Sequence, residues 1–153
     1  MIRDARADDL ARLRAIQVAA LDEPWDGLLE PAIAGPPVVL VTTAGDQPGA
    51  NDLAASSERN DPVGYAVAIP EGSSAYLAEF AVAAGHRRSG RGSQLMSALC
   101  SRLASDGFET LRLMVQLDDD RARAFYDAQG FRVRSLLPHH YDDGDGLELV
   151  RSL

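Results

Sequence analysis

Residues 75–104 constrain the fold most, because a strand, a basic glycine turn and a helix follow one another there without a break. AYLAEFAV (75–82) is apolar and rich in residues typical of strands, and the turn GHRRSGRG (85–92) comes next. The apolar residues that follow recur at helical spacing, at Leu95, Met96, Leu99, Cys100 and Leu103. The chain is therefore expected to mix strands and helices around one core.

The turn at the start of this helix predicts an anion site. Gly90 and Gly92 let the backbone approach a ligand closely, and the first N–H groups of a helix lack partners within it. These groups and the helix dipole favour a phosphate, and Arg87, Arg88 and Arg91 add positive charge. No Gly-Lys-Ser/Thr follows and no GxGxxG is present, which excludes a nucleotide P-loop and a dinucleotide fingerprint. A glycine turn with solvated arginines is the alternative.

Composition favours one acidic domain over residues 1–153. The net charge of −8 argues against general nucleic-acid binding, which needs a basic face. No apolar run approaches the roughly 18–20 residues of a membrane span, and MIRDARADDL lacks the apolar region of a signal peptide. A cytoplasmic protein that does not bind membranes is expected.

The fifteen basic residues are all arginine. GC-rich codon usage explains this bias. Adaptation to molar salt, where an acidic surface keeps a protein in solution, explains the bias together with the acidic excess. Both explanations stay open, and the halophilic one is preferred.

Periodicity and turn residues predict alternating elements. Helices are expected over 7–21, with Asp8 or Asp9 as its cap, briefly within 23–33, after the glycine turn, and over 121–129, closed by Gly130. Residues 44–62 read as a long polar, mobile connection. Strands are expected at 38–43, 110–116, 131–137 and 148–153. Two further strands, 63–69 and 75–82, are expected to form an antiparallel pair.

The order of these elements resembles the GNAT family of acyl-CoA-dependent N-acyltransferases over most of the chain. AEFAV precedes Arg87-x-x-Gly90-x-Gly92, and AFYDAQGF follows at the family's spacing. The resemblance implies an α/β fold with a mixed, mostly antiparallel central sheet flanked by helices, and acetyl-CoA held by its pyrophosphate at the glycine turn. The cofactor contacts that it implies are Phe80, Ala81, Val82, Arg87, Arg88, Ser89, Gly90, Arg91, Gly92, Ser93, Asp119 and Tyr126.

Within that family the chain is similar to the RimI-like and archaeal N-terminal protein acetyltransferases. HRRSGRGSQLM, the PW of LDEPWDG and the ending YDDGD carry this similarity. It implies that Trp25 and Tyr141 border the acceptor site, although packing explains both equally well. His140, Met114 and Asp119 depart from the branch, which often has tyrosine, glutamate and asparagine at these positions.

Two side chains are candidates for the chemistry of acyl transfer. An amine must lose a proton before it attacks a thioester, and the thiolate leaves more readily as a thiol. Glu79, near the expected splayed end of its strand, is the candidate base; a cation-attracting role and simple outward alternation on the strand are alternatives. Tyr126 resembles the family's general acid, with packing beside Phe125 as the alternative. A backbone N–H near Val82 is expected to hold the oxyanion.

Other chemical residues are assigned structural roles. Cys100 is expected in the core, His139 and His140 in a solvated loop, and DDDR (118–121) at a helix cap, and no metal site is expected. The first acceptor considered is a protein or peptide α-amine, and the second is a small amine such as a polyamine, an amino acid or an antibiotic-like compound. A sensor domain that binds acyl-CoA without turnover, and assembly as a homodimer, also stay open.

Overall fold

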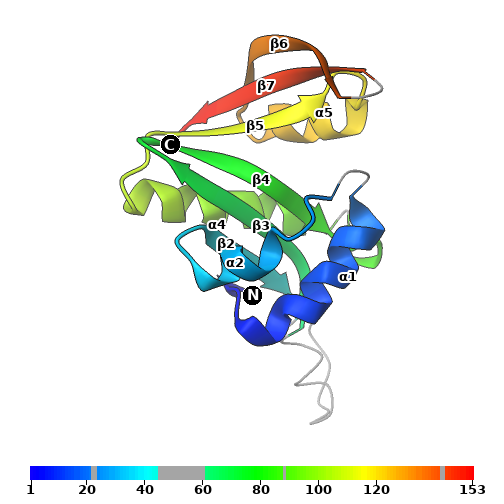
Figure 1. Ribbon diagram of the computed structural model, residues 1–153, viewed down its shortest axis with the longest axis vertical. Coiled ribbons are helices and arrows are strands. Elements are labelled where there is room, and N and C mark those ends of the chain that lie inside the picture. Colours follow the sequence, from blue (N-terminus) through cyan, green and yellow to red (C-terminus); the bar gives the residue numbers. More distant parts are fainter. Residues whose placement is uncertain (22–23, 45–60, 88, 142–143) are drawn as a thin grey trace. The chain divides into compact units, whose positions relative to one another are not determined.

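The structure is a computed structural model that describes residues 1–21, 24–44, 61–87, 89–141 and 144–153 (Figure 1). Seven strands form one mixed sheet in the order β1-β2-β3-β4-β5-β7-β6. Pairs β1–β2, β2–β3, β5–β7 and β6–β7 are antiparallel, whereas β4 and β5 are parallel. The predicted α/β class with a mostly antiparallel sheet is confirmed. Arg88 and most of the expected connection 44–62 lie outside the described residues.

The elements occur close to where the sequence predicts them. In chain order they are β1 (Ile2–Asp4), η1 (Ala7–Asp9), α1 (Leu10–Ala20), α2 (Leu29–Ala34), β2 (Val38–Thr43), β3 (Pro62–Glu71), β4 (Ser74–Val82), η2 (Ala84–His86), α4 (Arg91–Ser105), β5 (Thr110–Gln116), α5 (Asp120–Ala128), β6 (Arg132–Tyr141) and β7 (Gly144–Ser152).

Contacts divide the chain into two units, Met1–Ile69 with Ala78–Leu99 and Pro70–Leu77 with Cys100–Leu153. In the first unit, α1 and α2 pack on one face of β2 and β3 (Figure 1). Successive strand side chains point to opposite faces, so odd-numbered residues face these helices and even-numbered ones face away from them. The core on the helix side contains Leu13, Ile16, Leu29, Ala32, Val39, Val41, Tyr65, Val67 and Ala81.

The start of α1 differs from the expected helix over 7–21. Residues 7–9 form the 3₁₀ turn η1, and α1 follows from Leu10. The expected cap, Asp9, binds no N–H of α1 through its side chain. Its carboxylate accepts instead from the backbone N–H of Arg6 at 2.7 Å and from the Arg3 guanidinium at 2.7 and 2.9 Å. The acidic residue thus holds β1 to the first turn of helix.

In the second unit, β7 pairs with β5 on one side and β6 on the other. β4 enters this unit with Ser74–Tyr76, which pair with Thr110–Arg112 of β5. α5 begins at its cap Asp119, whose carboxylate accepts from the N–H of Ala122 at 3.1 Å. The predicted cap in DDDR is confirmed, and Gly130 follows the helix in the left-handed conformation with φ 89°.

The two edge strands of the sheet, β6 and β1, differ from what the sequence predicts. His139 and His140 are exposed as expected, but they lie in β6 and not in a loop. β6 continues past Pro138 because it is an edge strand, where a missing N–H removes no required ladder bond. Its pairing with β7 is irregular between Leu137 and Tyr141, and His139 has φ 56°. The short strand β1 was not predicted, because three residues show no readable alternation.

Within the described residues, no helix is long and apolar enough to cross a membrane.

Candidate active site

Glu79 is buried in the first unit. β4 alternates between buried and half-buried residues, and Glu79 falls on the buried side with Leu77 and Ala81. Its exposed fraction is 5%, so the interpretation that it points outward on the strand is wrong. A buried carboxylate needs hydrogen-bond donors, because removal of a charge from water is costly.

Three neutral groups supply these donors. The Gln17 amide donates from Nε2 to Oε1 at 2.8 Å and to Oε2 at 3.0 Å. The Tyr65 hydroxyl donates to Oε1 at 3.0 Å, and the backbone N–H of Trp25 donates to Oε2 at 2.8 Å. Each oxygen has two donor atoms within hydrogen-bond distance, and a carboxylate offers about four lone-pair sites in all. The acceptor capacity of Glu79 is therefore taken up by the protein itself.

Burial raises the pKa of Tyr65 well above its ordinary value of 10.0, and the charge and hydrogen bond of Glu79 raise it further. Tyr65 therefore keeps its proton and acts as a donor to Glu79. The hydroxyl comes from β3, Gln17 from α1 and Trp25 from the segment before α2. One carboxylate thus ties together three elements of the first unit.

Gln17 and Tyr65 are site residues that the sequence reasoning missed. Gln17 lies on the buried face of α1 with Leu13 and Ile16, and it is 7% exposed. A glutamine on the core-facing side of an amphipathic helix must find a buried partner, and that signal was available in the sequence. Nothing in the sequence of β3 distinguishes Tyr65 from an ordinary core aromatic residue.

The backbone of Trp25 is hydrogen-bonded, whereas its side chain is exposed. The backbone N–H is bound to Glu79, and the carbonyl accepts from Gln17 at 3.3 Å and from the N–H of Leu28 at 3.2 Å. The indole is 51% exposed. The Trp25 backbone therefore contacts the Glu79 carboxylate directly, whereas the indole lies at the surface.

The glycine turn has the local geometry of an anion site. Gly90 has φ 79°, a conformation that side chains disfavour, and an added Cβ there would meet no protein atom within 4 Å. Its carbonyl accepts from the N–H of Gln94 at 3.0 Å, which closes the first turn of α4. The first N–H groups of an α-helix have no partner within the helix and point toward its N-terminal end, which favours an anion there. This geometry fits a pyrophosphate.

The two described arginines of the turn have different partners. Arg87 is exposed and donates from Nε to the carbonyl of Val82 at 2.9 Å. Arg91 donates from Nη1 to the carbonyl of Thr43 at 2.8 Å, and its buried Nε has no hydrogen-bond partner in the described part of the chain. Arg87 is therefore placed to meet an anion, whereas Arg91 links α4 to the end of β2.

The backbone N–H of Ala83, just after β4, is already paired and is a poor candidate for holding the oxyanion. It donates to the carbonyl of Val63 at 2.7 Å. Gly64, next to Val63, makes this close approach possible, because a Cβ there would lie 2.9 Å from the carbonyl oxygen of Ala81. Phe80, Ala81 and Val82 form the last residues of β4, as the sequence predicts.

Tyr126, Asp119 and Tyr141 belong to the second unit. Tyr126 lies on α5 and packs edge-to-face against Phe125 and Phe131, with ring centroids 5.3 and 5.6 Å apart. Burial raises the pKa of Tyr126 well above its ordinary value of 10.0, and the charges of Asp119 and Tyr141 raise it further. Tyr126 therefore stays protonated at neutral pH, as a general acid requires.

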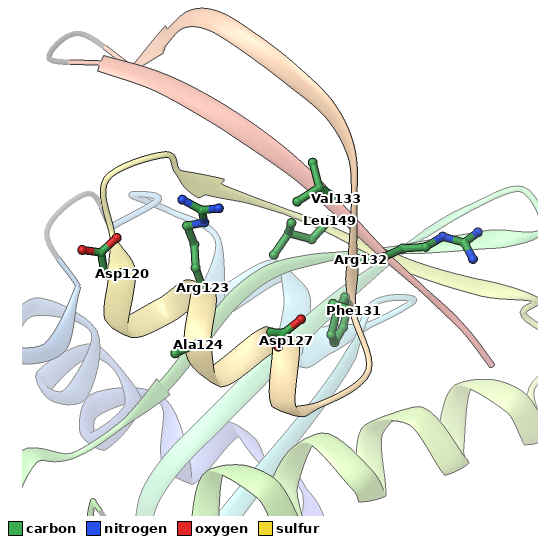
Figure 2. Close-up of a pocket in the computed structure, with 8 residues that line it drawn as sticks. All are labelled: Asp120, Arg123, Ala124, Asp127, Phe131, Arg132, Val133 and Leu149. Atoms are coloured by element: carbon green, nitrogen blue, oxygen red, sulfur yellow. The ribbon is translucent and has the colours of Figure 1, made fainter.

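A pocket lies between α5 and the strands β6 and β7, apart from the residues predicted for the site (Figure 2). It is a pocket of ≈ 400 Å³ with the apolar side chains of Phe131, Val133 and Leu149, and Asp120 and Arg123 project beside it from α5. None of its eight lining residues is a predicted site residue. We assign no ligand to this pocket.

The lone cysteine is a core residue. Cys100 is 6% exposed in α4, and burial raises the pKa of its thiol, which disfavours the reactive thiolate. The prediction of a core role is confirmed. Among the described residues, no group of three or more His, Cys, Asp or Glu side chains could hold a metal ion.

The chain matches the family model described as the acetyltransferase (GNAT) family over residues 13–131, and it belongs to that family. Acetyl-CoA is the cofactor of this family, and the glycine turn at the start of α4 fits its pyrophosphate. The members of the family are acyl-CoA-dependent transferases. No curated protein matches the chain.

Solved structures share the fold over nearly the whole chain. Ard1 from Thermoplasma volcanium is 25% identical with a TM-score of 0.81, covering 100% of this chain and 97% of its own. The ribosomal-protein-S18-alanine N-acetyltransferase from Escherichia coli is 22% identical with a TM-score of 0.78, covering 99% and 92%. Arabidopsis thaliana NAA60 in complex with acetyl-CoA is 16% identical with a TM-score of 0.80, covering 100% and 98%. The last two show the fold alone.

Proposed function

We propose that the chain is an acetyl-CoA-dependent N-acetyltransferase of the cytoplasm whose acceptor is the α-amine of a protein or peptide. Family membership supports acetyl transfer to an amine. The ending YDDGD and the PW segment support the N-terminal branch, and a solved structure with the same fold is named for an alanine of a ribosomal protein. The observation that carries the choice of acceptor is the hydrogen bonding of Glu79.

The Glu79 carboxylate already accepts from three donor groups, so a new proton would have to displace one of them. A peptide α-amine has a reference pKa of about 8, so a usable fraction is neutral near pH 7 without a strong base. A lysine side chain near 10.4 needs more assistance. The geometry therefore favours the α-amine.

The roles of the residues follow from this choice. Acetyl-CoA supplies the acyl thioester. Glu79 draws the protonated amine toward the end of β4 by its charge, and the amine gives its proton to water before it attacks the thioester. Trp25, whose backbone N–H is bound to Glu79, borders the acceptor. Tyr126, which stays protonated at neutral pH, donates a proton to the departing sulfur. The exposed Arg87, the N–H groups at the start of α4, and Arg88 are the cofactor contacts.

A small cationic amine is the second candidate. Glu79 is a buried negative charge with neutral donors, and the chain carries a net charge of −8, so the field around the molecule favours a cation. A polyamine would gain more from this field than a peptide whose only positive charge is its terminus. A domain that binds acyl-CoA without turnover is a third outcome of the same experiment.

The test is thiol release from acetyl-CoA with three acceptor sets. They are peptides with a free α-amine, the same peptides with a blocked α-amine and an added lysine, and polyamines. The proposal expects turnover on the first set that depends on the first residues, with little competition from polyamines. Turnover confined to polyamines would move the function to the second candidate. Binding of coenzyme A without turnover on any set would make the chain a binding domain.

A further inference from the structure

We propose that Gln17 positions Trp25 for the acceptor, by tying the Trp25 segment to the buried carboxylate of Glu79. The anchoring stands on hydrogen bonds within the first unit. The consequence for the acceptor rests in addition on the proposed function. Gln17 is thus a positioning residue that acts through Glu79 and Trp25.

The side-chain amide of Gln17 bridges two acceptors. Nε2 lies 2.8 and 3.0 Å from the carboxylate oxygens of Glu79 and 3.3 Å from the carbonyl oxygen of Trp25. An amide nitrogen carries two hydrogens, so one serves the carboxylate and the other the carbonyl. Both partners accept only, and the nitrogen must therefore face them. The orientation of the amide is set by this chemistry.

The Trp25 backbone is held on both sides of its α-carbon. Its N–H is bound to Glu79 at 2.8 Å, and its carbonyl also accepts from the N–H of Leu28 at 3.2 Å. Gly27 has φ 78°, which a tight turn of this kind requires at its third residue. The segment is therefore a turn whose first residue is fixed to a buried charge.

A fixed backbone beneath an exposed indole is suited to recognition. The Trp25 side chain is 51% exposed although both backbone groups are anchored. A rigid aromatic ring offers a large contact area at little cost in conformational entropy. Without Gln17, the Trp25 carbonyl loses one donor and the Glu79 carboxylate loses its bridging donor. The ring then samples more orientations, and an acceptor must order it on binding.

The direct test measures the backbone order of Trp25 by ¹⁵N relaxation in the protein without any substrate. In the wild type we expect an order parameter of about 0.85 at the Trp25 amide, and in Gln17→Leu a fall below about 0.6. Tyr65→Phe is the matched control, because it removes a donor from the same carboxylate without touching the Trp25 segment. Its Trp25 amide should keep the wild-type value. An unchanged order parameter in a folded Gln17→Leu protein would overturn the proposal.

A negatively charged side chain at position 17 gives a further check. Gln17→Glu keeps the length of the side chain but places a second carboxylate against Glu79, where like charges repel. It should loosen Trp25 at least as much as Gln17→Leu does. A Trp25 amide as ordered as the wild type in this variant would also contradict the proposal.

One measurement needs no variant, which covers the case in which a substitution prevents folding. The Trp25 amide of the wild type donates to a buried carboxylate, so its hydrogen exchange should be slower than that of an unstructured amide. Exchange at the unprotected rate would overturn the anchoring.

Kinetics test the consequence for the acceptor. Gln17→Leu should raise KM for the acceptor about threefold to tenfold, the change that one lost hydrogen bond produces, with KM for acetyl-CoA unchanged. A fall in kcat alone would contradict a positioning role. If no acceptor turns over at all, the proposed function fails, while the relaxation and exchange measurements still decide the anchoring.

Discussion

Two buried carboxylates of the first unit show how different partners give the same residue type different roles. Asp9 is paired with a cation, since the Arg3 guanidinium binds both of its oxygens at 2.7 and 2.9 Å. Within the described residues, Glu79 accepts from an amide, a backbone N–H and a phenol, and from no cation. Asp9 is thus compensated as an ion pair, whereas Glu79 keeps a field that can act on a cationic acceptor.

Asp9→Asn should lower the free energy of unfolding at pH 7 by about 1.5–3 kcal/mol, the range for hydrogen bonds to charged groups. Burial raises the pKa of Asp9, but the hydrogen bonds from Arg3 and Arg6 outweigh it and lower the pKa below 3.8. The contribution is therefore complete above about pH 3.8 and is lost as the pH falls toward the lowered folded value. Urea unfolding between pH 7 and pH 3 measures it, and an equally steep acid loss in the variant would contradict the assignment.

Tyr126→Phe tests the proposed general acid. We expect kcat to fall by roughly 10²-fold, with KM for acetyl-CoA unchanged, because the ring packing against Phe125 and Phe131 is kept. Since the pKa of Tyr126 is raised, the ratio of wild-type to variant rates should stay constant up to about pH 9. A full-rate Tyr126→Phe enzyme would leave Tyr126 a packing residue only.

The position of the last residues of β4 depends on how closely β3 can approach them. An added Cβ on Gly64 would lie 2.9 Å from the Ala81 carbonyl oxygen and 2.9 Å from the Thr42 side chain. The contact with Ala81 involves backbone, which cannot move aside as a flexible side chain can. Gly64 therefore permits the packing that places Glu79 and Val82.

Gly64→Ala should cost about 1–3 kcal/mol of stability, as overpacking of a buried site does, and should lower turnover by displacing the end of β4. Gly85→Ala is the control, because its Cβ would meet nothing within 4 Å and it lies in the turn just after the same strand. Thermal unfolding and thiol release compare the two. Equal stability of both variants would contradict the close approach.

The elements also show what the sequence could predict. Alternation and turn residues gave β2 to β5 and α5 nearly to their bounds, because each has a clear period and a clear stop. They failed at β6, since Pro138 and the two histidines look like a loop unless the strand is known to lie at an edge. In the site, Glu79 and the glycine turn could be read from the chain. The partners of Glu79 could not, because Gln17 and Tyr65 are 62 and 14 residues away in sequence.

At the scale of the whole molecule, the charge is the most unusual property. The chain has twenty-three acidic residues and fifteen arginines. Several arginines form ion pairs, such as Arg112 with Glu71 and Glu148. The remaining net charge of −8 repels itself at low salt and is screened at high salt, where the Debye length falls to about 3 Å at 1 M.

If the acidic excess is an adaptation to salt, the unfolding temperature should rise from dilute buffer to molar KCl, and turnover should rise with it. A thermal scan over KCl concentration measures this, with a neutral osmolyte at matched osmolality as the control. Full stability and activity in dilute buffer, with no gain from KCl, would leave codon usage as the explanation of the composition.

We propose that this member of the GNAT family acetylates an α-amine, and mass spectrometry of the product gives the most direct test. A peptide with a free α-amine and one lysine is incubated with acetyl-CoA and the protein, and the acetyl group is located by fragmentation. We expect one acetyl group on the α-nitrogen, formed more slowly by Tyr126→Phe. Acetylation of the lysine alone, or of added polyamine with the peptide untouched, would contradict it.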